Sequence, residues 1–498
     1  MTGCRDEQIH PHRGFRDAQG GIPAPAARPY SMSDTSPALQ PFLDNRTTVL
    51  KDGVPNETAR YVLYWMQVYK RSTHNPALSK AIHIANELKL PLVVYEGLKY
   101  YYPWASDRLH TFILEGVAEK KKAFAEKGIR YVFYLQADKH APKNTVAKLA
   151  EEAALLVTDD FPCFIIPEHN RHIAERVSIP ILAVDGNGMI PMSLLTKEEW
   201  AARTIRPKIQ RMLPGHLQDL RTPALHLRHP ELPVSCPETA VTAGNIAKLV
   251  AGCDIDHSVP PSPVYSGGEA AARKRLHHFV THILPGYDTL RNKPDLDGCS
   301  RLSAYLHFGF ISPQQIYAAV TSADAPEAAK AAFIEELVVR RELSYNFTRH
   351  NPAYASLASL PDWAKRTMDK HAKDPRPALF TAAQIEAGDT YDTLWNATQG
   401  ELLKTGEIHN YMRMLWGKKI IEWMPTYEEA FALLEHLNNK YSLDGRNPNS
   451  YAGILWCFGK HDRAWGPERP VFGTLRYLSS DSWRRKVNAK AYIDQYGM

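Results

Sequence analysis

Cysteine is scarce in this sequence, with 6 in 498 residues, and no two of them form a Cys-x-x-Cys pair. A disulfide framework needs a higher density of cysteines, and a zinc site needs closely spaced ones. The composition therefore favours a reducing, intracellular compartment, either cytoplasmic or, in a eukaryote, nuclear or organellar. It predicts no metal site.

Long apolar runs and the common nucleotide-binding motifs are missing as well. No segment stays apolar over the roughly 20 residues that a membrane-spanning helix requires, so we expect no membrane association. No G-x-G-x-x-G follows the first predicted strand and no Walker A sequence occurs, which leaves ordinary dinucleotide or NTP chemistry unsupported. A net charge of +6 permits an anionic partner such as nucleic acid but does not require one.

Aromatic residues, in contrast, are plentiful, with 10 tryptophans and 24 tyrosines. They suit stacking or electron transfer, although a large helical core would also accommodate them. The 44% hydrophobic and 23% charged residues are typical of a globular protein, and the length indicates two domains. Residues 1–44, rich in Pro, Gly and Ala and without an apolar stripe, are predicted to be a disordered extension.

Short apolar runs alternate with amphipathic helical patterns over residues 45–212. We predict strands at 61–66, 91–97, 130–136, 154–160 and 179–186, because these runs are β-branched or aromatic and bounded by turn residues. This alternation predicts an α/β domain with a Rossmann-like, doubly wound parallel sheet. Such a sheet binds ligands at the carboxyl ends of its strands, but no motif indicates which ligand.

Strand patterns end after this domain. Residues 213–268, punctuated by Pro, His and Gly, are predicted to be an interdomain linker. Residues 269–498 are helical in period throughout, with helix starts at Ser312-Pro313 and at Thr426, which has Glu429 three residues on. The second half is therefore predicted to be an all-α domain.

Three segments of the helical half could carry chemistry. Trp416 and Trp423 are seven residues apart on one predicted helix, about 10.5 Å along its axis, and Trp395 precedes them; packing in a core is the alternative interpretation. Ser300 and Ser303, with backbone N–H groups near Arg301, could hold phosphate at a helix start, unless a serine merely caps the helix. A third segment, residues 437–486, interleaves arginines with aromatic residues, as in surfaces that hold a DNA backbone; a solvated basic tail is the alternative.

Charged residues also occur on an otherwise apolar helix, FIEELVVRRELSYNF, which carries Glu336, Arg340, Arg341 and Glu342. Buried charges are costly unless they are paired or bind a ligand, so such clusters mark sites, although internal salt bridges have the same effect.

Taken together, these segments resemble the successive motifs of class II cyclobutane pyrimidine dimer photolyases. The matching stretches, in order, are SRLSAYLHFG, EELVVRREL, LWNATQ, HNYMRMLWGKKIIEW, LDGRNPNSYAG and HDRAWGPER. The N-terminal YVLYWMQVYKRSTHNPAL is similar to that family's opening strand. The resemblance extends from about residue 45 to the end of the chain and implies a helical domain that binds FAD.

The resemblance implies a role for individual residues. The cofactor residues would be Tyr287, Ser300, Leu302, Ser303, Arg341, Arg413, Asn438 and Asp444, with Asn438 near flavin N5. Trp395, Trp416 and Trp423 would form the relay that photoreduces oxidised flavin. Glu336 would hydrogen-bond the flipped-out dimer. The other lesion and DNA residues would be Arg291, Arg340, Met414, Trp456, Arg463 and Arg476.

The implied activity is light-driven repair of pyrimidine dimers in double-stranded DNA by a monomer, with electron transfer from reduced FAD, FADH⁻. The resemblance also allows an antenna chromophore, 8-hydroxy-5-deazaflavin or a folate, in the sheet domain. Two alternatives remain: a cryptochrome-like blue-light photoreceptor, and a light-independent nucleic-acid-binding protein in which the tryptophans are plain core.

Overall fold

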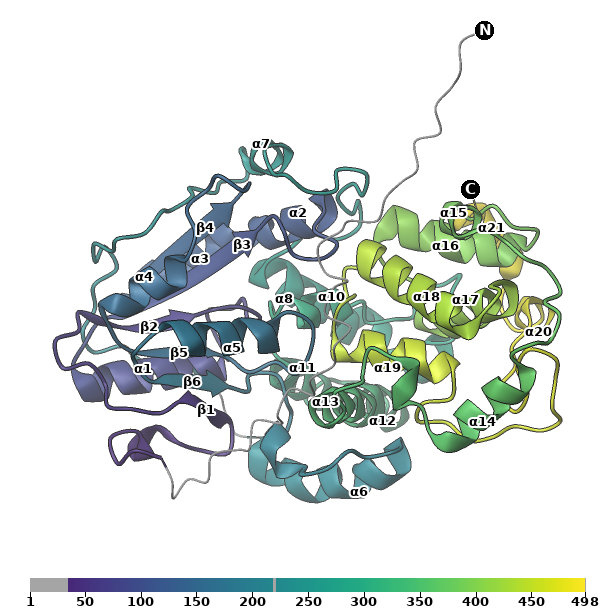
Figure 1. Cartoon of the computed structure of the whole chain (residues 1–498), viewed down its shortest axis with the longest axis horizontal. Helices are drawn as coiled ribbons and strands as arrows, with labels where there is room; N and C mark the ends of the chain where they lie inside the picture. Colours follow the sequence, from purple (N-terminus) through teal and green to yellow (C-terminus); the bar gives the residue numbers. More distant parts are fainter. Residues whose placement is uncertain (1–34, 218–220, 498) are drawn as a thin grey trace, which may run out of the picture.

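The N-terminal half of the computed structural model is built on one six-stranded sheet (Figure 1). The structure describes residues 35–217 and 221–497. The strands are β1 (Thr47–Lys51), β2 (Tyr61–Trp65), β3 (Leu92–Lys99), β4 (Arg130–Gln136), β5 (Ala153–Asp159) and β6 (Ile181–Val184), in the order β1-β6-β5-β2-β3-β4. All neighbours are parallel except β1 and β6. The predicted doubly wound parallel sheet is confirmed, and β1 adds an antiparallel edge that the sequence analysis missed.

The strands are apolar on both faces because helices cover both faces. On β2, Val62 and Tyr64 pack in one hydrophobic cluster with α1 (Pro76–Leu88), α2 (Asp107–Glu115) and α3 (Val117–Glu126). Tyr61, Leu63 and Trp65 point the other way and pack with α4 (Thr145–Glu151) and α5 (Ile166–Arg176). This alternation follows from the two-residue period of a strand.

The segment between the halves follows the free edge of β4. The backbone N–H groups of His229, Thr239 and Asp254 donate to the carbonyls of Gly128, Phe133 and Ala137. The segment also contains α7 (Ile246–Ala251), a short helix that the sequence analysis did not predict. The predicted linker therefore lies against the sheet, as Figure 1 shows.

The C-terminal half is helical, and among its described residues no strand occurs beyond one isolated bridge. Its α-helices are α8 (Glu269–His278), α9 (Tyr287–Leu290), α10 (Ser303–His307), α11 (Pro313–Thr321), α12 (Glu327–Ile334), α13 (Arg341–His350), α14 (Asp362–His371), α15 (Ala382–Ala387), α16 (Thr393–Thr405), α17 (Asn410–Trp423), α18 (Tyr427–Tyr441), α19 (Pro448–Cys457), α20 (Ser480–Arg484) and α21 (Ala489–Tyr496). Capping boxes at Ser312 and Thr426 confirm the two predicted helix starts. The predicted all-α half is thus present.

Buried arginines join the two halves. Arg71 donates to the carbonyls of Gly309 and Gly186, 3.1 and 2.8 Å away. Arg108, on α2, donates to the carbonyls of Leu402 and Leu403. These bonds place a cation from the sheet domain among helix-end carbonyls, where its charge is favourable.

Two details differ from the sequence analysis. Residues 35–44 are not a disordered extension: Leu39 and Phe42 are buried in the sheet domain's core because α1 and the sheet leave apolar surface there. The rest of that predicted extension lies outside the described residues. Helix α6 (Ala202–Met212), predicted within the sheet domain, contacts the helical half instead.

In the described part of the chain, no helix is long and apolar enough to cross a membrane.

Candidate functional site

A π-helical segment, η7 (Glu335–Arg340), interrupts the long helix formed by α12 and α13. Such segments occur frequently at functional sites, because the wider turn re-aims side chains. It carries the predicted lesion residues Glu336 and Arg340. Arg291 Nη1 donates to Glu336 Oε1 at 3.0 Å, and the Arg291 guanidinium lies 5.8 Å from the ring centre of Tyr287. Two predicted lesion residues and one predicted cofactor residue therefore meet here.

The Arg340 guanidinium, from the same segment, lies over the ring of Trp456, 5.5 Å from its centre. Its Nε is also 3.5 Å from Glu335 Oε1, and Glu335 is paired with Arg206 of α6 at 2.6 Å. The sulfur atom of Met414 lies 4.0 Å from the sulfur atom of Cys457, the residue after Trp456. The structure thus brings Arg340 of η7 against Trp456 of α19, and Met414 of α17 against the next residue of α19.

An arginine–aspartate pair marks the predicted cofactor region. Arg413 Nη2 lies 2.8 and 2.9 Å from the two carboxylate oxygens of Asp444. Burial opposes the charge on Arg413, but the carboxylates of Asp444, Glu407 and Glu401 together outweigh it, so the pKa of Arg413 is raised. Asn438 is buried at the end of α18, and its amide donates to Asn439. The loop that carries Asp444 packs tightly there, since a Cβ on Gly445 would lie 2.8 Å from the Asn438 carbonyl oxygen.

The predicted phosphate loop leads into α10, which begins at Ser303. Its N-cap is Leu302, and no side chain caps the helix. Ser300 Oγ accepts from Leu302 N at 3.4 Å, and the Ser300 carbonyl accepts from Arg275. The alternative interpretation of a serine N-cap is therefore wrong.

Behind this loop lies a buried polar cluster that the sequence analysis missed. Glu401 accepts hydrogen bonds from the Tyr492 hydroxyl at 2.5 Å and the His409 backbone at 3.1 Å, and burial raises the pKa of Glu401 to about 7. His409 Nε2 lies 3.1 Å from the Cys299 sulfur. The Tyr265 hydroxyl donates to Glu407, whose pKa burial also raises. These bonds tie the loop to the turn between α16 and α17.

Arg341, also predicted to line the cofactor, contacts two neighbouring residues of α13. Its Nη1 donates to Glu342 at 2.9 Å, and its guanidinium lies 4.3 Å from the ring centre of Tyr345. Glu342 accepts from the Met189 backbone of the sheet domain, and burial raises the pKa of Glu342 to about 7. Within the described residues, Arg341 Nη2 is buried without a hydrogen-bond partner.

The three predicted relay tryptophans form one connected group. Trp395 Nε1 donates to the Trp416 carbonyl at 3.0 Å, and the ring centres of Trp395 and Trp423 are 5.1 Å apart. Trp395 and Trp423 are fully buried and Trp416 nearly so. The rings also belong to the core of the helical half, so the core interpretation and the relay interpretation are compatible.

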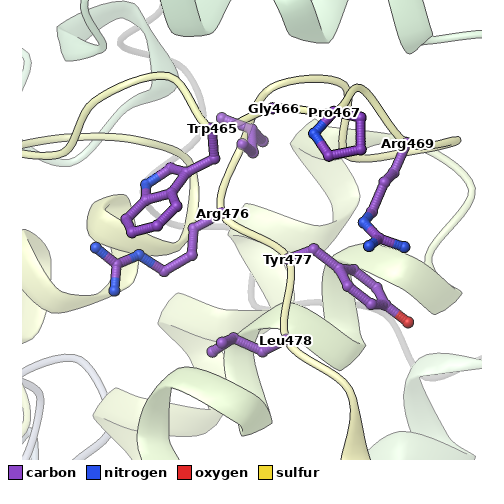
Figure 2. Close-up of a pocket in the computed structure, with 8 residues that line it drawn as sticks. Trp465, Gly466, Pro467, Arg469, Arg476, Tyr477 and Leu478 are labelled. Atoms are coloured by element: carbon purple, nitrogen blue, oxygen red, sulfur yellow. The ribbon is translucent and has the colours of Figure 1, made fainter. Parts of the chain in front are cut away.

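A cavity of about 260 Å³ follows α19 and lies in the predicted DNA-holding segment (Figure 2). The guanidiniums of Arg463 and Arg476 each lie 4.2 Å from the ring centre of Trp465. Arg476 is also paired with Asp462 at 3.0 Å. In Figure 2, Trp465 and Arg476 line one side of the cavity, and Arg469 and Tyr477 line the other. Guanidiniums on aromatic rings suit both phosphates and unstacked bases.

Known proteins match this chain over nearly its whole length. The family profile described as DNA photolyase matches residues 62–226. The deoxyribodipyrimidine photo-lyase of Methanothermobacter thermautotrophicus is 38% identical over 442 residues, covering 89% of this chain and 95% of that protein. The chain belongs to the DNA photolyase family. The match explains why the predicted motifs occur in one order along the sequence.

Solved structures of the photolyase and cryptochrome family share the fold. A class III photolyase from Agrobacterium tumefaciens superposes with a TM-score of 0.62 at 18% identity, covering 88% of this chain and 86% of that one. A Synechocystis cryptochrome superposes with a TM-score of 0.66 at 16% identity, covering 88% of each chain. Because both repair enzymes and cryptochromes have this fold, the fold alone does not separate the two activities.

Several residues of the site were missed by the sequence analysis. Arg206 and Glu335 are 129 residues apart, so no local pattern connects them. Cys299 and His409 are 110 residues apart. His461, 6.2 Å from Trp456 between ring centres, stands within a quoted motif and could have been found there.

Proposed function

We propose that this protein repairs cyclobutane pyrimidine dimers in DNA with blue light, as a photolyase of the class II type. The observation that carries the proposal is its 38% identity to a deoxyribodipyrimidine photo-lyase across 95% of that enzyme. The gathering of Arg291, Glu336, Arg340 and Trp456 around η7 supports it, because these are the residues predicted to contact the lesion. We expect a monomer to act on double-stranded DNA.

The residues of the helical half fit FAD. The N–H groups at the start of α10 have no side-chain cap, which leaves them for a phosphate beside Ser300 and Ser303. Near Asn438 and Asp444, the buried polar atoms Asn439 Nδ2 and Ser442 Oγ have no partner among the described residues. Buried polar groups are normally satisfied, so these atoms indicate a polar ligand.

The cofactor residues would divide the work of holding FAD. Ser300, Leu302, Ser303 and Tyr287 would hold its phosphate and ribityl side, with Arg341 also lining the cofactor. Arg413, oriented by Asp444, would hold the edge of the ring system, and Asn438 would present a neutral amide. Bound FAD, once reduced and excited by light, supplies the electron that splits the cyclobutane ring.

The lesion residues would stabilise the dimer outside the duplex. Removing a base from the stack exposes the atoms that react. Glu336 would hydrogen-bond the dimer. Arg291, 3.0 Å from Glu336, would fix the orientation of that carboxyl group, and its positive charge would stabilise the negative charge that the dimer gains. Arg340, Met414 and Trp456 would pack around the lesion, while Arg463 and Arg476 would hold the opened duplex.

An antenna chromophore, 8-hydroxy-5-deazaflavin or a folate, is proposed at the carboxyl ends of the parallel strands, where doubly wound sheets bind ligands. At this edge the ring of Trp65 stacks on His169, with 5.9 Å between ring centres. Two aromatic rings beside the strand ends suit a flat pigment.

One experiment tests the main proposal. The purified protein is examined by absorption spectroscopy, then reduced and illuminated with an oligonucleotide that contains one thymine dimer. We expect flavin absorbance and light-dependent restoration of the thymines, with no repair in the dark. Bound flavin without repair would favour the cryptochrome-like photoreceptor, and a protein unable to bind flavin would favour the light-independent nucleic-acid-binding protein.

A further inference from the structure

The tryptophan relay ends inside the protein. Trp423, the last of the three rings, is fully buried, and so is Trp395 before it. An electron that leaves the relay for the interior must be replaced from solvent. A buried indole cannot meet a dissolved reductant directly, so the geometry calls for one more group between Trp423 and the surface.

Tyr391 occupies that place. It lies just before α16 and is 62% exposed, and its ring centre is 5.7 Å from that of Trp423. The Trp423 indole N–H donates to the Tyr391 hydroxyl at 3.1 Å. Phe380 packs against the rings of Trp423 and Tyr391, at 5.3 and 5.8 Å between centres.

The charges around Trp423 favour transfer of the positive charge of the oxidised indole toward the surface, to Tyr391. The Lys419 ammonium lies 5.3 Å from the Trp423 ring centre and is paired with Glu422 at 2.6 Å. A positive charge on the indole is repelled by this ammonium. Tyr391 avoids that cost, because an exposed phenol can lose its proton together with its electron.

We propose that Tyr391 is the terminal, solvent-facing electron donor of the relay Trp416–Trp395–Trp423. This rests on the proposed function. One electron leaves Trp416 for the excited, oxidised flavin, and the vacancy passes through Trp395 to Trp423. Tyr391 then gives one electron to oxidised Trp423 and its phenolic proton to water. The resulting neutral tyrosyl radical regains a hydrogen atom from a dissolved thiol.

The direction of the hydrogen bond supports this step. The Tyr391 oxygen accepts from Trp423, so the hydrogen of the hydroxyl points away from the indole. Because the side chain is exposed, water can take that proton. Electron and proton therefore leave Tyr391 in different directions, the electron inward and the proton outward.

The test compares Tyr391→Phe with Tyr101→Phe in the flavin-loaded protein. Tyr391→Phe keeps the ring and removes only the hydroxyl. Tyr101 is the matched control, because it is 53% exposed and its ring contacts Tyr100 and Lys99 in the sheet domain. After a light pulse, electron paramagnetic resonance should detect a neutral tyrosyl radical in the wild type and in Tyr101→Phe. Tyr391→Phe should lack it, and its photoreduction yield with thiol should fall several-fold.

A second measurement guards against indirect effects. In heavy water, transfer from Tyr391 should slow in the wild type, and Tyr391→Phe should lose this isotope effect. A tyrosyl radical that persists in Tyr391→Phe, or a wild type that shows only a tryptophanyl radical, would overturn the inference. Repair by chemically reduced wild type tests the proposed function separately, because it needs no relay: a tyrosyl radical without repair would overturn the proposed function and leave the role of Tyr391 standing.

Discussion

Arg291, which directly follows α9, forms an ion pair with Glu336 of η7, with 3.0 Å between Nη1 and Oε1. Both side chains are partly exposed, at 30% and 37%, so the pair is accessible from solvent. The pair therefore combines an orienting contact with access. This combination is what a residue needs to hold an extruded base.

Glu336→Ala should lower the quantum yield of repair more than the affinity for dimer-containing DNA. The carboxyl group is proposed to act when the dimer gains charge, and such an interaction affects the reaction more than binding. Repair yield and equilibrium binding are measured on the same oligonucleotide. Glu327→Ala, an exposed carboxylate at the start of α12, is the control. A loss of affinity without a loss of yield would contradict this role.

Trp416→Phe and Trp423→Phe should each block photoreduction of oxidised flavin, while repair by chemically reduced enzyme stays largely intact. Phenylalanine retains an aromatic ring but is much harder to oxidise than tryptophan. Trp483→Phe is the control, since Trp483 stacks on Tyr411, at 4.8 Å between ring centres, outside the relay. If the relay variants lose both activities equally, the tryptophans are only core.

Arg476→Ala should weaken binding to dimer-containing duplex DNA and flatten its salt dependence. Loss of one phosphate contact reduces the slope of log K against log salt by about one. Binding is measured across a series of salt concentrations. Arg171→Ala, on the exposed face of α5, should leave the slope unchanged. An unaltered slope in Arg476→Ala would place its guanidinium away from the DNA.

Glu401→Gln should reduce the pH dependence of stability. Burial raises the pKa of Glu401 to about 7, above its usual 4.5. The folded state therefore holds this proton more tightly than the unfolded state, and the free energy of unfolding falls as pH rises from 4.5 to 7. Glutamine cannot ionise, so its contribution to this fall should disappear.

Denaturant unfolding at several pH values measures the effect. Glu342 and Glu435, whose pKa values burial also raises to about 7, should keep part of the dependence in the variant. Glu428→Gln, at an exposed position in the first turn of α18, is the matched control. An equal pH dependence in Glu401→Gln and the wild type would show that the carboxyl group ionises normally.

Patterns within a few residues of one another predicted much of the fold. The short, continuous apolar runs of β2 and β5, whose residues are all buried, indicated buried strands of a parallel sheet. The capping boxes at Ser312 and Thr426 set helix starts by bonds that span three residues. β1 was missed because only Val49 among its five residues is buried, so its apolar signal is weak.

The sequence predicted which residues belong to the candidate site, but not which of these residues contact one another. Family motifs named Arg291, Glu336, Arg340 and Trp456, and their positions as site residues remain proposals. Which side chain contacts which, such as Arg340 over Trp456, emerges only in the folded chain. Tyr391 gave no signal in the sequence, because a tyrosine before a helix is an ordinary surface residue.

By itself, the sequence determined the two halves, most of their secondary structure and the family, because these depend on local periodicity and on motifs in order along the chain. Only the tertiary structure decided that Trp423 is buried and Tyr391 exposed at its edge, that Arg206 reaches Glu335, and that Cys299 meets His409. Burial and contact between distant residues depend on how whole helices pack, and no short stretch of sequence contains that information.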